Sequence, residues 1–190
     1  MSNAESSRAK ILAAATEEFA AHGIAGARVD RIAKRSGMSK PMLYAYFGSK
    51  DALFDAVFLA HVIANKERVP FTAGDLPGYA VELYGDYLAD PALMRLLMWK
   101  RLERDAAGYL YHGLQDHDAQ HFRDIAEQQR AGAIRGDLDP IDIWSLLIAS
   151  AATWAQGSIT VVAVSTDTAA EHERRRSALA AFVASALAPA

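Results

Sequence analysis

Apolar residues recur at helical spacing through almost the whole chain, and the pattern is clearest within the first fifty residues. Val29, Ile32 and Ala33 fall at i, i+3 and i+4, so they share one face of a short helix. Gly37 predicts the end of that helix, because glycine enters the left-handed backbone conformation at low cost. Ser39 is then placed to cap a second helix. Two short helices joined by a tight turn predict a helix-turn-helix.

The second helix of this pair has an inward and an outward face. Leu43 and Phe47 are expected inside, which leaves Pro41 and Ala45 at the centre of the outward face. Small residues at this centre would let the helix approach base edges in a DNA groove. The neighbouring side chains carry charge, a hydroxyl or a thioether, and they are Lys40, Met42, Tyr44, Tyr46 and Lys50. Residues 40–42 are predicted to reach base edges, while Tyr44 and Lys50 are predicted to bind phosphates.

The remainder of the chain also has the periodicity of helices, so the predicted fold class is all-α. Capping signals at Asp90-Pro91 and Asp139-Pro140 open two helices, and Thr168 with Glu171 forms a capping-box pattern. Residues 158–164 are rich in β-branched side chains but have no partner strand, so we expect them to end the eighth helix. In all we expect about nine helices, namely the two of the helix-turn-helix and residues 7–22, 49–67, 76–88, 90–104, 107–131, 139–164 and 168–187.

Prolines and glycines gather near residues 68–77 and predict a boundary between a small N-terminal domain and a larger one. The preceding helix, 49–67, then reaches into both. We therefore assign residues 1–50 to a helix-turn-helix DNA-binding domain and residues 51–190 to a ligand-binding and dimerisation domain.

Charge is distributed unevenly between these parts. The net charge is -3, but residues 1–50 hold eight Lys and Arg against four Asp and Glu, or +4, and residues 51–190 hold twelve against nineteen, or -7. The basic charge therefore lies with the helix-turn-helix, where DNA binding requires it. Cysteine is absent, which excludes disulfides and thiolate metal sites. No apolar run reaches the ~20 residues of a membrane span, so we expect no membrane partner and no signal peptide.

Taken together, these motifs resemble those of the TetR family of bacterial transcriptional regulators. The matching segments are His22-Gly23, Val29-x-x-Ile32-Ala33, Ser36-Gly37-Met38-Ser39 and Leu43-Tyr44-x-Tyr46-Phe47-x-Ser49-Lys50-x-x-Leu53. The resemblance implies a cytoplasmic homodimer that binds a quasi-palindromic double-stranded operator and releases it when a small molecule enters the C-terminal domain. The family often has threonine where this chain has Val29, so the phosphate contact of that threonine is expected to be lost here or taken over by Arg28. The full predicted DNA-binding set is Arg28, Ser39, Lys40, Pro41, Met42, Tyr44, Tyr46 and Lys50.

The larger domain combines aromatic and methionine side chains with polar groups that a sealed core seldom contains. Any single aromatic residue there is more simply explained as core, but the combination is typical of a ligand pocket. The candidate ligand-binding residues are His61, Tyr84, Tyr87, Met98, Trp99, His121 and Phe122. From them we expect a small, largely apolar effector.

Dimerisation is expected through the eighth and ninth helices. The eighth is apolar nearly all the way round, and the ninth places Leu179, Phe182, Val183 and Ala186 on one face. Two copies of each helix can pack as a symmetric four-helix bundle.

Two other function classes remain beside a DNA-binding regulator: a helical interaction protein without DNA contact, and an all-helical enzyme or metal-binding protein. His117, His121 and Asp124 have the i, i+4, i+7 spacing of a metal site, although most such sets face solvent. No catalytic triad, phosphate loop or cofactor fingerprint is present, so we expect neither an enzyme nor a cofactor. A helical dimer that binds a ligand or metal without DNA is the alternative. The sequence leaves open the effector, the operator, the regulated genes, and repression versus activation.

Overall fold

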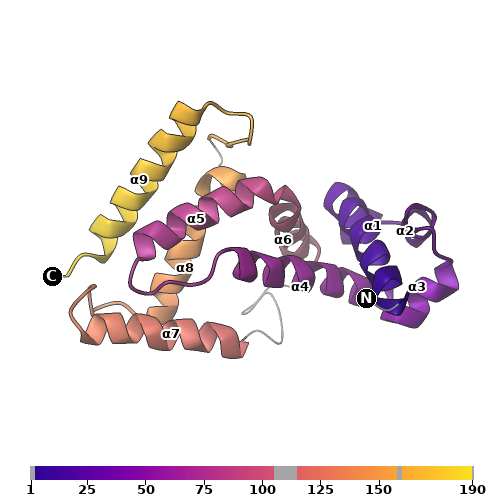
Figure 1. The fold of residues 1–190 in the computed structure, drawn as a ribbon, viewed down its shortest axis with the longest axis horizontal. Helices are drawn as coiled ribbons and strands as arrows, with labels where there is room; N and C mark the ends of the chain where they lie inside the picture. The colour runs from indigo at the N-terminus through magenta and orange to yellow at the C-terminus, as the bar shows by residue number, and fades with distance from the viewer. Residues whose placement is uncertain (1–2, 105–114, 158–159, 190) are drawn as a thin grey trace. The chain divides into compact units, whose positions relative to one another are not determined.

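The computed structural model describes residues 3–104, 115–157 and 160–189. Within these ranges it contains nine α-helices and one π-helical turn (Figure 1). The helices are α1 (Asn3–Gly26), α2 (Val29–Ser36), α3 (Lys40–Phe47), α4 (Lys50–Arg68), α5 (Leu76–Ala89), α6 (Pro91–Glu103), α7 (Gln115–Arg130), α8 (Pro140–Ala151) and α9 (Ala169–Leu187), with the π-helical turn η1 (Thr153–Gly157) after α8. The predicted all-α fold is confirmed.

The described residues form two compact units. Unit 1 is Met1–Ala64 with Ala92–Leu110, and unit 2 is Asn65–Pro91 with Tyr111–Ala190, each counted over its described residues. Two helices contain a division point, α4 after Ala64 and α6 after Pro91. Over the described ranges, every helix is too short or too polar to cross a bilayer.

Unit 1 has an aromatic core between α1 and α4. The rings of Phe19 and Phe54 meet edge to face with centroids 5.2 Å apart, and Phe58 stacks on Phe54 at 6.3 Å. Ile32 of α2 and Leu43 of α3 are fully buried as well. Ile32 and Leu43 follow the predicted inward faces of α2 and α3, because each helix buries the stripe that repeats every three or four residues.

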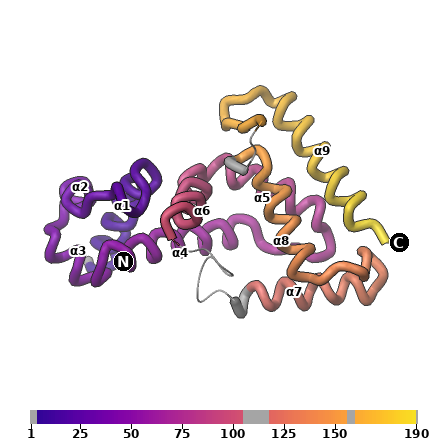
Figure 2. The backbone as a smooth tube through the Cα atoms, turned by 180° about the vertical axis from the view of Figure 1, so that it is seen from behind, coloured from indigo at the N-terminus to yellow at the C-terminus, as the bar shows by residue number. Residues whose placement is uncertain are grey.

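In unit 2, α5 packs against both α8 and α9 (Figures 1 and 2). Leu83 and Tyr84 are at most 1% exposed, and Leu147 of α8 and Leu179 of α9 are buried too. The predicted capping box of α9 is present, since the amide of Glu171 donates to Thr168 Oγ1 at 3.2 Å and the amide of Thr168 donates to the Glu171 carboxylate at 2.9 Å. Local capping and one buried stripe therefore fix this helix.

The eighth helix is shorter than predicted. Its α-helical part ends at Ala151, η1 follows, and residues 160–164 are not helical. Val161, Val162 and Val164 are 48–55% exposed there. β-branched side chains lose rotamer freedom against the preceding helical turn, which disfavours extending a helix through three valines. The prediction that this segment ends the helix is wrong for residues 160–164, and residues 158–159 lie outside the described ranges.

Candidate DNA-binding site

The helix-turn-helix begins with a buried carboxylate on α1. Glu18 is 3% exposed, and its Oε1 accepts from the backbone amide of Arg28 at 2.9 Å and from Nε of Arg31 at 2.8 Å. Burial raises the pKa of Glu18, but these two hydrogen bonds outweigh burial and leave the pKa below its ordinary value. Glu18 thereby fixes the first turn of α2 on α1.

The turn between α2 and α3 has the predicted geometry. Gly37 has φ 69 and ψ 20, in the left-handed region, and the amide of Met38 returns to the carbonyl of Ala33 at 3.1 Å. Ser39 caps α3 by accepting from the amide of Met42 at 3.3 Å. Glycine and serine at these two positions confirm the predicted turn and cap.

The outward face of α3 is open to solvent. Leu43 is 2% exposed and anchors the helix, whereas Met42 is 42%, Tyr44 41% and Tyr46 37% exposed. The other exposed members of the predicted DNA-binding set are Arg28, Ser39, Lys40 and Pro41. Seven of the eight predicted residues therefore lie where a duplex could reach them.

Lys40 is held at the start of this face by Asp30 of α2. Its Nζ lies 3.0 Å from Asp30 Oδ1, and that hydrogen-bonded ion pair raises the pKa of Lys40. Both side chains remain substantially exposed, so the pair orients Lys40 without removing it from solvent. Asp30 is a supporting residue that the sequence pattern did not single out.

Lys50, the eighth predicted residue, is half-buried at the start of α4. Its Nζ donates to the carbonyls of Ala25 and Ala27 at 3.2 and 3.3 Å. An ammonium has three donors, so one hydrogen remains for a phosphate while two tie α4 to the segment before α2. Lys50 therefore has a structural role in addition to the predicted one.

The predicted ligand-binding residues are divided between the two units. His61, Met98 and Trp99 belong to unit 1. His61 Nε2 lies 3.2 Å from the hydroxyl of Thr16, and the indole N–H of Trp99 donates to the carbonyl of Ala20 at 3.2 Å. Trp99 thus already has a partner on α1.

Tyr84, Tyr87, His121 and Phe122 belong to unit 2. The Tyr84 hydroxyl shares a 2.9 Å hydrogen bond with His172 Nδ1, and Tyr87 is 6% exposed with a pKa raised by its burial. Phe122 is half-buried. Two of these four side chains, Tyr84 and Tyr87, are therefore buried in the core of unit 2.

His121 lies in an aromatic cluster that the sequence analysis missed. Its ring is 4.4 Å from that of Phe71 and 4.5 Å from that of Trp144, and Tyr79 stacks on Trp144 at 6.0 Å. The cluster joins residues far apart in sequence, so only the presence of aromatic side chains in each segment could have signalled it.

A buried ion pair lies beside this cluster. The carboxylate of Asp118 is 2% exposed and lies 2.8 Å from Lys66 Nζ and 3.9 Å from His121 Nδ1. Ligand sites are typically lined by apolar side chains with a few polar groups among them. The aromatic cluster and the neighbouring ion pair have the same combination of side chains.

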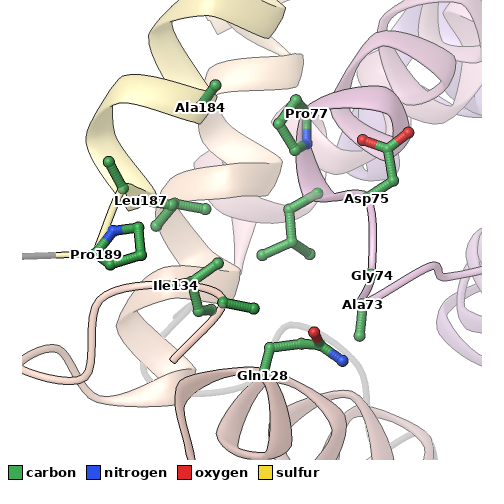
Figure 3. A pocket seen from close by; sticks show the side chains of 12 residues that line it. Ala73, Gly74, Asp75, Pro77, Gln128, Ile134, Ala184, Leu187 and Pro189 are labelled. Carbon is green, nitrogen blue, oxygen red and sulfur yellow. The ribbon is translucent and has the colours of Figure 1, made fainter. Parts of the chain in front are cut away.

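A cavity of about 410 Å³ lies elsewhere in unit 2 (Figure 3). Its lining is mostly apolar, with Gln128 and Asp75 as polar members. Asp75 is already engaged, since its carboxylate caps α5 by accepting from the amide of Gly78 at 2.9 Å. The cavity residues are Ala73, Gly74, Asp75, Leu76, Pro77, Gln128, Ala133, Ile134, Ala184, Leu187, Ala188 and Pro189, and the predicted ligand-binding residues are not among them.

The candidate metal-binding set has protein partners where it is described. Asp124 Oδ1 accepts from Gln120 Nε2 at 2.6 Å, and His121 faces Asp118. The side chain of His117 lies outside the described part of the structure. Within that part, no group of three His, Asp or Glu side chains is placed to hold a metal ion.

Two family models match the chain. Residues 11–57 match the model described as bacterial regulatory proteins, tetR family, and residues 75–184 match the one described as tetracyclin repressor-like, C-terminal domain. The first covers the helix-turn-helix, and the second covers most of unit 2.

Individual proteins agree with these matches. The chain is 36% identical over 152 residues to the HTH-type transcriptional repressor SCO4008 of Streptomyces coelicolor, covering 80% of this chain and 79% of that protein. The crystal structure of a regulator, SCO4942 from Streptomyces coelicolor, is 37% identical with a TM-score of 0.78, covering 97% and 99% of the two chains. A structure described as the molecular basis for control of antibiotic production by bacterial hormones is 26% identical, with a TM-score of 0.66 and coverage of 98% and 99%.

Proposed function

The chain belongs to the TetR family of bacterial transcriptional regulators and is a DNA-binding regulator, and we propose that it is a homodimeric repressor that a small, largely apolar ligand releases from its operator. The name of the relative SCO4008 as a repressor supports repression here. Action on bacterial DNA implies a cytoplasmic location, and regulation without catalysis fits the family.

The observation that carries the DNA-binding part is the outward face of α3. Ser39 and Gly37 fix its start, Leu43 anchors it, and the exposed side chains of residues 40–42 point away from that anchor. The N-terminal end of a recognition helix contacts base edges in helix-turn-helix complexes. We assign base contacts to Lys40, Pro41 and Met42, and phosphate contacts to the other members of the predicted set.

Exposed apolar side chains on α8 and α9 support dimerisation. Ile141 is 42%, Leu146 60% and Phe182 62% exposed, although sequence periodicity predicts α8 to be covered on several sides. The two helices are neighbours in unit 2. A second copy of the same pair would cover these side chains in a symmetric four-helix interface, which also pairs two recognition helices for a two-fold operator.

Effector binding in the C-terminal domain is supported by the aromatic cluster and the buried Lys66–Asp118 pair. Tyr84, Tyr87, His121 and Phe122 remain candidate ligand residues on the same unit. The related structure whose description names bacterial hormones adds support for a small diffusible effector.

Selection of bound sites from a pool of random duplexes tests this function. We expect one quasi-palindromic sequence to be enriched and to bind a dimer in sedimentation, with affinity that falls steeply with salt. An intact dimer that enriches no sequence would support the alternative, a helical ligand-binding protein without DNA binding.

A ligand test follows once the operator is known. Apolar compounds are titrated with and without operator while the tryptophan fluorescence of the wild-type protein is followed. An inducer must bind more weakly when operator is present, because the coupling between two binding sites is reciprocal.

A further inference from the structure

The last turn of α1 is interrupted at Gly23. This residue has φ 72 and ψ -176, which breaks the helical path before Ile24. A Cβ placed on Gly23 would lie 2.5 Å from Glu103 Oε1 and 2.9 Å from the ring of Trp99. Glycine is therefore required both for the backbone angle and for the close approach of two α6 side chains.

Those two side chains replace the interrupted helical hydrogen bond. In a continuous helix the amide of Ile24 would donate to the carbonyl of Ala20. Here the amide of Ile24 donates to Glu103 Oε2 at 2.6 Å, and the carbonyl of Ala20 accepts from the indole of Trp99 at 3.2 Å. The amide of Ala25 donates to the same Glu103 oxygen at 2.8 Å. α6 thus supplies a partner to both sides of the break.

The end of α6 is also fixed to the start of α4. Arg104, directly after α6, lies 2.6 Å from Asp55 and 3.0 Å from Asp51, and Lys100 lies 3.2 Å from Asp55. The Arg104 guanidinium also lies over the ring of Phe54, 5.1 Å from its centroid. α6 therefore cannot shift relative to α1 or α4 without breaking several charge-assisted contacts.

The segment that α6 holds leads directly into α2. Residues 23–28 are bound by Glu103 on one side, by Lys50 through the carbonyls of Ala25 and Ala27, and by Glu18 through the amide of Arg28. Val29 begins α2 immediately afterwards. Movement of this segment would therefore rotate or shift α2, and with it the recognition helix α3.

We propose that Glu103 and Trp99 are positioning residues for DNA binding, which set the placement of α2 and α3 by holding the segment around Gly23. This rests on the DNA-binding function of the family. A shift of α6 would separate Glu103 from the amides of Ile24 and Ala25, and the segment before α2 could then move.

The test compares Glu103→Ala with Glu127→Ala in the full-length protein. Glu127 is 65% exposed on α7, so its loss makes the same change of +1 in net charge far from these contacts in the chain. Fluorescence anisotropy measures affinity for the selected operator and for a random duplex at one salt concentration. Circular dichroism and sedimentation confirm that each variant is folded and assembled as the wild type is.

We expect Glu103→Ala to weaken operator binding about tenfold while random-duplex binding changes less than about twofold, because base contacts need exact placement and phosphate attraction does not. Trp99→Phe, which keeps the ring and removes only the N–H donor, should change in the same direction by roughly threefold. Glu127→Ala should leave the ratio of the two affinities unchanged.

An unchanged ratio in Glu103→Ala and Trp99→Phe would overturn the proposal, and so would equal losses on both duplexes, which indicate a smaller folded fraction. If Glu103→Ala does not fold, Glu103→Gln decides, because its carbonyl oxygen can still accept from both amides without the charge. If the wild type itself shows no preferred sequence, the proposed repressor function fails instead, and the two failures are distinct.

Discussion

The helix-turn-helix of unit 1 and the aromatic cluster of unit 2 differ in how far apart in the sequence their interacting residues lie. Ser39 and the amide it caps are three residues apart, and Gly37 ends α2 by its own backbone preference. In the cluster of unit 2, by contrast, His121 of α7 packs against Phe71, which precedes α5, and against Trp144 of α8. The DNA-binding motif is thus encoded locally, whereas the candidate effector site exists only after the unit has folded.

The first prediction tests whether the DNA-binding motif depends on unit 2 or whether the two units act independently. Phe182→Asp places a charge in the proposed dimer interface, so we expect a monomer in sedimentation and operator affinity reduced at least ~100-fold, because one half-site alone remains bound. The helix-turn-helix itself is unchanged. Operator affinity and the sedimentation coefficient are measured on the same samples.

Leu102→Asp is the matched control, since Leu102 is 71% exposed on α6 and receives the same charge. It should remain a dimer. A Phe182→Asp variant that stays dimeric and binds operator normally would show that α9 does not form the interface.

The sequence predicts the turn, the caps and the buried stripes because each depends on residues within one helical turn of one another. It does not predict Glu18, whose partner amide follows ten residues later, or the Lys50 contacts to carbonyls more than twenty residues earlier. Nor does it separate Trp99, bound to α1, from His121, packed against Phe71. Which aromatic residues share a site is decided by tertiary packing, and single-residue preferences carry no information about it.

A second prediction concerns Lys40 and Lys50, which the sequence assigns to base edges and to phosphates respectively. Lys40→Ala should reduce operator affinity by about 1–3 kcal/mol and relax preference at particular base pairs. Lys50→Ala should weaken binding to both operator and random duplexes and lower the salt slope by about 1. Because Lys50 also holds the carbonyls of Ala25 and Ala27 before α2, the operator should lose somewhat more affinity than the random duplex. Anisotropy titrations over a salt series measure both quantities.

Arg130→Ala removes the same charge from an exposed position on α7 and controls for net charge. Lys50→Arg keeps the positive charge and should restore most of the binding. Identical profiles for the two alanine variants on all duplexes would contradict the division into base and phosphate contacts.

A third prediction tests Glu18, which supports the helix-turn-helix from α1. Glu18→Gln should lower the free energy of unfolding by about 1–3 kcal/mol near neutral pH, because a charged acceptor of two donors is lost. The folded-state pKa of Glu18 lies below 4.5, so its contribution is fully present above pH 4.5 and is lost as the pH falls through the folded-state value. Denaturant unfolding at several pH values should therefore show the gap between wild type and variant closing in acid. A gap that is constant with pH would mean that the carboxylate charge does not contribute.

The smallest expected effects come from matched helix caps, one in each unit. Ser39 caps α3 and Thr168 caps α9, and replacing either with alanine should cost about 0.5–2 kcal/mol of stability. Their effects on DNA should nevertheless differ. α3 has eight residues and carries the proposed base contacts at its capped end, so Ser39→Ala should also weaken operator binding severalfold. Thr168→Ala, at the start of a nineteen-residue helix in unit 2, should leave operator affinity within about twofold. Thermal unfolding and anisotropy on the same samples separate the two quantities. Equal losses of operator affinity would mean that stability alone, and not the geometry of the recognition helix, sets DNA binding.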